Sequence, residues 1–477
     1  MKATRWDCFG AEEGEMKAVR TETRDLMEQA TERAVRYLET LEARRVFPTV
    51  EAVSLLTELG GPFPAGGSEP TEVLRLLDEI GSPAAVASAG PRYFGFVTGG
   101  ALPATLAANW LAGAWDQCAG LDVLSPVSSA LEEISARWLI ELFGLPRECA
   151  VGFVTGATMA NFTALAAARN AVLERAGWDV EADGLIGAPK ITVIGGEEIH
   201  ISAVKALGML GLGRNRIVRV PADSQGRMRA ELLPRIDGPT IVCMQAGNVN
   251  SGAFDPAKEI CAVAHAGRAW VHVDAAFGLW AAAAPSRAHL VAGLSEADSW
   301  ATDAHKWLNV PYDSGIAFVR EDRHLKAAMS ANAAYLVRGE KRDPNLFTPE
   351  MSRRARGAEI WAALRSLGRN GLADLIERNC RMAARFAEGL KAGGFEILNE
   401  VVLNQVLVSF GEDAKTREVI AALQAEGTCW CGGTVWHGRA AMRIAVSSWA
   451  TAEADVERSL ESMIRVAAQV KARQGYC

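Results

Sequence analysis

The sequence predicts an α/β protein whose central β-sheet is mostly parallel and flanked by helices. Four short runs, at 191–194, 217–220, 240–244 and 270–273, are rich in apolar residues, and helical stretches separate them. These runs show little polar alternation, which is typical of strands that are buried on both faces of a sheet. Strands that alternate with helices favour a parallel order. We expect this large α/β domain to occupy residues 86–345.

A helical segment is expected before that domain, over residues 1–85. Apolar residues recur there at the spacing of one helix face: Leu26, Ala30, Ala34, Leu38 and Leu41. Glycines and prolines between residues 60 and 67 predict a loop, and Pro70 predicts the start of another helix.

A smaller α+β domain is expected over residues 346–477. Its expected elements are helices at 359–367, 372–392 and 452–472 and strands at 406–410 and 442–446. These patterns follow the helical period and the apolar runs of buried strands.

Composition limits the classes of partner. The chain has 477 residues, 49% of them hydrophobic and 22% charged, which is typical of a globular protein with a large core. A net charge of −7 without a basic stripe argues against nucleic acid. The apolar segment 275–284 is too short to span a bilayer, and residues 1–7 lack the apolar region of a secretory signal. We therefore expect a cytoplasmic protein with no membrane partner.

The nine cysteines are odd in number and scattered, which does not fit a disulfide framework. One residue separates Cys429 from Cys431, a spacing that matches neither a redox pair nor a zinc knuckle. Although His437 is nearby, buried thiols are the ordinary explanation of this pair. No metal is predicted.

Two motifs together predict a site for pyridoxal 5′-phosphate (PLP). Residues 302–307 (TDAHKW) lie downstream of residues 272–276 (HVDAA). A buried Lys306 amine can form a Schiff base with the cofactor aldehyde. Asp274, at the end of an apolar strand, can pair with the pyridine nitrogen and keep it protonated. Alone, the two residues would be a surface lysine and a turn-capping aspartate, but their order and spacing favour the cofactor.

A third motif, residues 155–158 (TGAT), closes an apolar run and opens a helical stretch at 159–169. Small residues let backbone N–H groups approach a phosphate, and a helix N-terminus adds positive potential. A simple threonine N-cap is the alternative. The position ahead of the other two motifs favours phosphate binding at Gly156, Ala157 and Thr158.

With these motifs the chain resembles the group II PLP-dependent amino-acid decarboxylases, relatives of the aromatic-L-amino-acid, glutamate and cysteine-sulfinate decarboxylases, and especially bacterial members of unassigned substrate. The resemblance runs from about Leu38 to the C-terminal region. It is carried by residues 91–96 (PRYFGF), 155–161 (TGATMAN), 200–206 (HISAVKA), 247–255 (GNVNSGAFD), 272–276 and 302–307. It implies a fold-type-I PLP-dependent transferase fold. It also implies a homodimer with shared active sites, in which the N-terminal helices pack across the partner.

The resemblance implies catalytic roles for Lys306, His200 and Asp274. His200 would lie flat over the cofactor ring, where it could also move protons. Ser299 and His305 would lie near the phosphate or the substrate, and we expect His272 only to fill core space or a hydrogen bond. The complete predicted cofactor site consists of Gly156, Ala157, Thr158, His200, Asp274, Ala276, Ser299, His305 and Lys306.

The implied reaction is decarboxylation of an L-α-amino acid to an amine and CO2. Two departures from the family pattern bear on it. Many relatives carry a tyrosine on a loop after the lysine, but residues 339–350 contain none, Phe347 is their one aromatic residue, and Tyr335 lies outside them. Asp303 stands where many relatives carry asparagine beside the phosphate, so its charge would need a compensating donor.

Three alternatives remain open. In plant relatives phenylalanine in place of that tyrosine is associated with aldehyde synthesis, so the chain could be an aldehyde synthase. A transaminase-like enzyme with the same cofactor is a second alternative. A PLP-binding protein without turnover is another, although the combination of Asp274, His200 and Lys306 argues against it. The substrate itself is not identified by the sequence.

Overall fold

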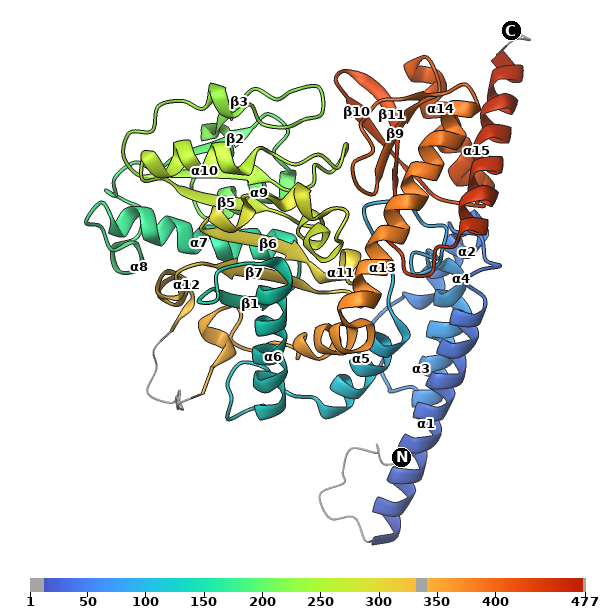
Figure 1. Ribbon diagram of the computed structural model, residues 1–477. Coiled ribbons are helices and arrows are strands. Elements are labelled where there is room, and N and C mark those ends of the chain that lie inside the picture. Colours follow the sequence, from blue (N-terminus) through green and yellow to red (C-terminus); the bar gives the residue numbers. More distant parts are fainter. Residues whose placement is uncertain (1–12, 332–340, 475–477) are drawn as a thin grey trace.

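The protein is described by a computed structural model that covers residues 13–331 and 341–474. Its larger sheet has seven strands in the order β1-β7-β6-β5-β4-β2-β3 (Figure 1). All of them run in one direction except β7, which is antiparallel to β1 and β6. The strands are β1 (Ala150–Val154), β2 (Thr192–Gly196), β3 (Val218–Val220), β4 (Thr240–Gln245), β5 (Trp270–Asp274), β6 (Ser299–Asp303) and β7 (Gly315–Val319). The mostly parallel sheet that the sequence predicts is confirmed.

Strands β2 to β5 fall on the predicted apolar runs, within two residues at each end. The sequence analysis did not single out β6 and β7. In β6 the polar residues Ser299, Thr302 and Asp303 interrupt the apolar pattern, yet all three are buried and hydrogen-bonded. Polar residues that find partners inside the protein are invisible to a hydrophobicity pattern.

Helices cover both faces of this sheet. On one face pack α7 (Ala157–Glu174), α9 (Ile201–Met209) and α12 (Asp322–Met329), and on the other α6 (Pro126–Phe143) and α10 (Ala257–Ala266). Successive strand residues enter different cores, for example Val193 one and Ile194 the other. Because both faces are buried, the strands show no polar alternation.

A second, antiparallel sheet follows in the chain, in the order β10-β11-β9-β8. Its strands are β8 (Glu396–Ile397), β9 (Gln405–Ser409), β10 (Gly432–Trp436) and β11 (Arg439–Ala445), and it packs with α13 (Gly357–Ala392), α14 (Asp413–Glu426) and α15 (Glu453–Gln474). The two helices predicted at 359–367 and 372–392 are the halves of α13. Gly368, at φ +59°, departs from helical geometry between them.

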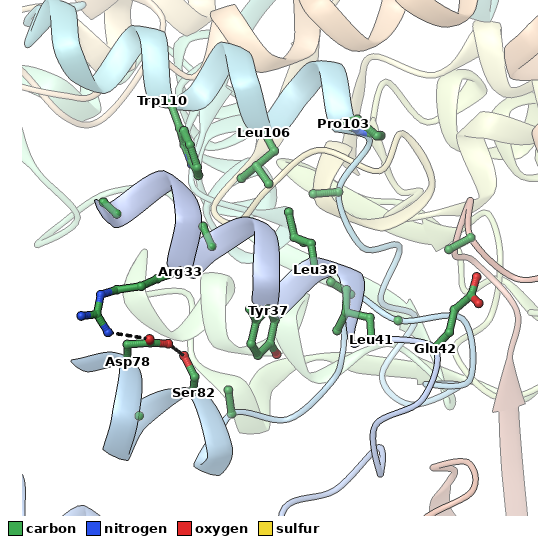
Figure 2. A pocket seen from close by; sticks show the side chains of 18 of the residues that line it. Arg33, Tyr37, Leu38, Leu41, Glu42, Asp78, Ser82, Pro103, Leu106 and Trp110 are labelled. Atoms are coloured by element: carbon green, nitrogen blue, oxygen red, sulfur yellow. Dashed lines mark hydrogen bonds and ion pairs between the residues drawn. The ribbon is translucent and has the colours of Figure 1, made fainter. Parts of the chain in front are cut away.

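The N-terminal region is helical, as predicted. It contains α1 (Glu13–Glu39), α2 (Val50–Ser54), α3 (Pro70–Leu76) and α4 (Ser82–Ala84), and α5 (Pro103–Trp115) follows it. Figure 1 shows the N-terminal part of α1 extending beyond the rest of the chain. Between α1, α5 and residues 74–85 lies a cavity of about 760 Å³ with a mostly apolar lining (Figure 2).

The division into regions 1–85, 86–345 and 346–477 stays a prediction, since α13 packs on elements of both sheets. None of the helices within the described ranges is long and apolar enough to cross a membrane.

Candidate functional site

The carboxyl ends of β1, β5 and β6 meet at one edge of the large sheet and bring three predicted motifs together. Asp274 is the last residue of β5, Asp303 is the last residue of β6, and Gly156 immediately precedes α7. Lys306 follows β6 in the short helix α11 (Ala304–Trp307). Sheets of this kind bind ligands at this edge, beyond the carboxyl ends of their strands.

The amine of Lys306 is paired with a buried carboxylate. Its Nζ lies 2.8 Å from Oδ2 of Asp303, and the two side chains are 16% and 3% exposed. Oδ1 of Asp303 accepts a hydrogen bond of 2.5 Å from the backbone N–H of Ala157. The compensating donors that the charge of Asp303 requires are therefore present, and they are groups of the predicted cofactor site itself.

His305 lies beside the same carboxylate, with Nε2 3.4 Å from Oδ1 of Asp303. Its Nδ1 accepts a hydrogen bond of 3.2 Å from the N–H of Ser314, and its ring stacks on Tyr312 with the centroids 4.2 Å apart. Burial lowers the pKa of His305, although the charge of Asp303 opposes that shift. His305 is therefore a neutral imidazole near pH 7 that can donate from Nε2.

Asp274 is a buried carboxylate held by neutral groups. Nδ2 of Asn161 donates to its Oδ2 over 3.0 Å, Oγ of Ser202 lies 3.3 Å from the same oxygen, and the N–H of Ala276 donates to Oδ1 over 3.3 Å. No lysine, arginine or histidine in the described part of the chain forms an ion pair with it. A buried negative charge without a cation matches the needs of a protonated pyridine nitrogen.

His200 is the N-cap of α9. Its Nδ1 accepts a hydrogen bond of 3.2 Å from the N–H of Ser202 and lies 2.7 Å from Oγ of that serine. Burial lowers the pKa of His200; the charge of Asp274 opposes the shift, and that of Lys306 adds to it. The imidazole thus lies within electrostatic reach of both groups, and it is neutral near pH 7.

A chain of hydrogen bonds runs along the α7 face of the sheet next to Asp274. Nε1 of Trp270 donates to Oγ of Ser299 over 2.8 Å, and that hydroxyl lies 2.9 Å from Nδ1 of His272. Nε2 of His272 lies 2.9 Å from Oδ1 of Asn161. Because the amide nitrogen of Asn161 serves Asp274, its oxygen faces His272 and accepts from a proton on Nε2. Burial accordingly lowers the pKa of His272 to about 4, against the opposing charge of Asp274.

The structure places one member of the predicted site, Ser299, away from the others. This serine is the first residue of β6 and fully buried, whereas Asp303 and Lys306 stand at the opposite end of the strand. Four residues of extended chain separate the ends of β6 by roughly 13 Å. On this face of the sheet Ser299 hydrogen-bonds His272, which in turn contacts Asn161, and Asn161 donates to Asp274; a contact of Ser299 with the phosphate or the substrate stays a prediction that this position does not favour.

The other predicted residues lie around the strand-end edge, and their contacts with the cofactor stay predictions. They are Gly156, Ala157, Thr158, His200, Asp274, Ala276, His305 and Lys306. His272 fills core space and hydrogen-bonds, as expected, whereas Asn161 entered the sequence analysis only as part of a motif. Their role becomes visible only when α7 and β5 are packed side by side.

The described part of the loop, residues 341–350, keeps Phe347 away from the site. Phe347 is 7% exposed and belongs to the core beneath α7 and α9. Its carbonyl oxygen lies so close to Gly152 on β1 that a Cβ there would be 2.2 Å away. Phe347 is therefore a packing residue and is not presented to a reacting carbon. Tyr335 lies outside the described residues, as does the first part of the predicted loop.

The closely spaced cysteines do not form a metal centre with His437. Cys429 and Cys431 are fully buried thiols, whereas His437 is exposed at a turn, with Nε2 3.2 Å from the carbonyl oxygen of Ser224. Over the described ranges no group of three or more His, Cys, Asp and Glu side chains is arranged to hold a metal ion.

Arg443 on β11 is a candidate that the sequence analysis missed. Burial lowers the pKa of its guanidinium, and no acidic group of the described residues counteracts that shift. Its Nη1 donates to the carbonyl oxygen of Val249 over 3.3 Å. Its charge also contributes to the lowered pKa of His200, so the two side chains are close. The sequence did carry a signal for Arg443, because it is a charged residue within the apolar run 442–446 that was predicted as a strand.

These groups fit pyridoxal phosphate. The cofactor requires an amine for its aldehyde, an anion for its pyridine nitrogen and positive potential for its phosphate. Lys306, Asp274 and the N-terminus of α7 supply one each, at the same edge of one sheet.

The comparison with known families decides the class. The model of the pyridoxal-dependent decarboxylase conserved domain matches residues 77–411, more than half of the chain. The chain belongs to the pyridoxal-dependent decarboxylase family. Pyridoxal phosphate is its cofactor, and it is a carboxy-lyase that acts on an amino acid.

Similar proteins differ in their products. Tryptophan decarboxylase 1 of Oryza sativa subsp. japonica is 27% identical over 93% of this chain and 94% of its own. The 4-hydroxyphenylacetaldehyde synthase of Rhodiola rosea is also 27% identical, over 93% and 96%. The crystal structure of Oryza sativa TDC with PLP and tryptamine has a TM-score of 0.85 and 24% identity, covers 94% of this chain and 98% of that one, and shares the fold. These likenesses leave the amino acid and the final product open.

The neutral state of His272 makes stability depend on pH. Because its pKa falls from about 6.5 in the unfolded chain to about 4 when buried, the unfolded state binds more protons between those values. Stability contributed by His272 is complete above pH 6.5 and is lost as the pH falls toward 4, by up to about 3 kcal/mol. We expect His272→Gln to flatten this dependence in urea unfolding at pH 7.5, 6 and 5.

The lowered pKa values of His200, His305 and His324 act in the same direction, so the variant should reduce the dependence without abolishing it. Equal pH dependence of the variant and the wild type would show that burial does not keep His272 neutral in the folded protein.

Proposed function

We propose that the protein converts an L-α-amino acid into its amine and CO2, with Lys306, His200 and Asp274 as catalytic residues. Asp274 carries this proposal: it is a buried carboxylate, supplied with neutral donors and without a cationic partner among the described residues, at the same sheet edge as Lys306. A charge held in this way is poised for a cationic ligand.

Each of the three residues has a distinct task. When bound, pyridoxal phosphate supplies the electron-withdrawing ring on which the charge left by CO2 is spread. Asp274 holds a proton on the ring nitrogen, because no neighbouring cation competes for its charge. Lys306 offers the amine that anchors the cofactor through its aldehyde. His200 is neutral near pH 7 and can take up or return a proton.

Arg443 is the group that we assign to the substrate carboxylate. The side chain is half-buried, has no acidic partner among the described residues and lies near His200. Arginine holds a carboxylate in a fixed orientation through two parallel hydrogen bonds. Orientation of the carboxylate selects which bond at Cα breaks.

Protonation of the product is favoured over its oxidation because a phenol is present beside the lysine motif. Tyr312 stacks on His305 and is 61% exposed. It comes from a different segment from the loop tyrosine of many relatives. An aldehyde synthase or a transaminase-like reaction remains the alternative for the same residues.

The products distinguish these reactions. We expect the PLP-loaded enzyme, incubated separately with each of the twenty amino acids, to release CO2 and amine without hydrogen peroxide. Borohydride should fix the cofactor on Lys306, and Lys306→Ala should lose turnover by several powers of ten because the covalent route is removed. Label on another lysine would contradict the assignment, and peroxide with aldehyde in equal amounts would identify a synthase.

Substitutions of Asp274 and Arg443 should change different kinetic parameters. Asp274→Asn keeps a hydrogen bond and loses the charge, so kcat should fall by about two to four powers of ten with little change in KM. Arg443→Gln should instead raise KM by roughly 10- to 100-fold, because it removes a charged contact to the substrate. Steady-state kinetics measures both. Near-normal kcat in Asp274→Asn with PLP bound would make Asp274 a structural cap.

We also propose that the protein acts in the cytoplasm. The described residues include seven free cysteines, and Cys429 and Cys431 remain thiols although one residue separates them. Proteins of oxidising compartments form disulfides from such thiols.

A homodimer is supported by the apolar surface of the N-terminal region. The cavity of about 760 Å³ is open between α1 and α5, and Tyr37, Leu38, Leu106 and Trp110 line it (Figure 2). Large apolar side chains nearby are exposed: Met27, Val35, Val50, Val53, Leu55, Leu56, Leu59, Phe63, Val73, Leu77, Leu111 and Trp115. Monomers rarely leave so large an apolar area in water, so we assign this face to a second copy of the chain.

Leu38 tests this interface. It is 39% exposed and lines the cavity. Leu38→Asp should shift the protein toward monomer in sedimentation velocity and lower activity, because an obligate interface of more than about 2,000 Å² does not tolerate a buried charge. Glu28→Ala, on an exposed part of the same helix, is the control and should leave the dimer intact. A wild-type protein that is a fully active monomer would refute the proposal.

A further inference from the structure

Asp303 is fixed at the end of β6 by contacts on both sides of the strand. Its N–H donates to the carbonyl oxygen of Ala276 over 2.9 Å, and its own carbonyl accepts a hydrogen bond of 3.0 Å from Nε1 of Trp280. Its partner in register on β7 is Gly315. Gly315 lies so close to Gly156 that a Cβ would be 2.4 Å from the Gly156 Cα. The carboxylate is therefore held against the loop that opens α7.

From this position Asp303 engages two groups that the cofactor requires. Oδ1 accepts from the N–H of Ala157, and Oδ2 is paired with Nζ of Lys306. Gly156 is the N-cap of α7 and has no side chain with which to cap the helix. The carboxylate of Asp303 therefore serves as the cap. A free N-terminal amide attracts phosphate, and a free lysine amine attacks an aldehyde.

We propose that Asp303 weakens the binding of pyridoxal phosphate, so that the cofactor is exchangeable. Its charge lies at the helix terminus where the phosphate is expected, and two negative charges at that distance repel each other. Its ion pair also restrains the amine of Lys306, since a paired ammonium must lose a proton before it can act as a nucleophile. This inference rests on the proposed role of Lys306.

If Asp303 instead assisted cofactor binding, its substitution would change the Kd for the cofactor in the opposite direction. If Asp303 served mainly to orient Lys306 for the cofactor, its removal would weaken binding. If it competes with the phosphate and restrains the amine, its removal strengthens binding. The two roles are therefore separated by the direction of a single measured change.

The experiment compares the cofactor-free forms of the wild type, Asp303→Asn and Asp303→Ser. Both substitutions keep a group that can accept from the Ala157 N–H, and both remove the charge. Absorbance titration gives Kd for pyridoxal 5′-phosphate and for pyridoxal, which lacks the phosphate. We expect Kd for pyridoxal 5′-phosphate to fall by roughly 10- to 100-fold in both variants, and Kd for pyridoxal to fall by less.

Asp298→Asn is the matched control. Asp298 immediately precedes β6, where its Oδ2 accepts from the N–H of Val271 over 2.7 Å and lies 3.0 Å from Nε2 of His265. It resembles Asp303 in its contacts and differs in its distance from the site, so its loss should leave both Kd values unchanged.

Inorganic phosphate provides a measurement that does not involve the lysine bond. It should raise the Tm of the cofactor-free Asp303→Asn protein more than that of the wild type. Unchanged or higher Kd for pyridoxal 5′-phosphate would overturn the proposal, and equal changes for both ligands would overturn its phosphate component. Borohydride label on a lysine other than Lys306 would refute the proposed function, and the phosphate measurement would still decide the role of Asp303.

Discussion

A carboxylate buried at the end of a β-strand must be supplied with hydrogen-bond donors, and this requirement organises the interior around Asp274. Its donors come from α7 through Asn161 and from the backbone at Ala276, with Ser202 of α9 alongside. Asn161 is in turn orientated by His272. One charge therefore aligns β5 with two helices on the same face of the sheet.

Two buried carboxylates stand at the ends of neighbouring strands, and their charges are compensated in different ways. Asp274 receives neutral donors, which leave its charge available to a cationic ring nitrogen. Asp303 is paired with the Lys306 amine and accepts a hydrogen bond at the N-terminus of α7, so its charge is already compensated. Two aspartates on neighbouring strands are therefore proposed to act in opposite ways. Asp274 is available to a cationic ring nitrogen, and Asp303 disfavours the cofactor phosphate. This difference arises from the surrounding donors, because both side chains are buried.

The sequence predicts the parallel sheet, the strand ends and the motifs at Lys306 and Asp274 because these depend on local patterns. It fails where a partner from another element decides the outcome. The resemblance places Ser299 near the phosphate or the substrate, whereas in the structure it is the first residue of β6 and contacts His272, a neighbour that a motif does not reveal. Arg443 is missed because its significance lies in the absence of a nearby carboxylate among the described residues. Phe347 falls in the predicted loop yet packs in the core against Gly152.

The groups of the site come from both sheets, so their relative placement has to be fixed. The residues that follow Lys306 provide this link. Nε1 of Trp307 donates to Oδ1 of Asn379 on α13 over 2.9 Å. Nδ2 of Asn309 donates to the carbonyl oxygen of Ser447 over 3.1 Å, and its Oδ1 accepts from the N–H of Trp449 over 2.8 Å.

Ser447 and Trp449 directly follow β11, the strand that carries Arg443. The segment that bears the lysine amine is thus bonded to the segment that follows the guanidinium, within a buried part of the chain. Buried hydrogen bonds are costly to leave unmade, so the two sheets cannot separate here without exposing several unpaired groups. The distance between the Lys306 amine, the proposed cofactor anchor, and the Arg443 guanidinium, proposed to bind the substrate carboxylate, is therefore set by the backbone next to each of them. A substrate would meet these two groups in a fixed arrangement.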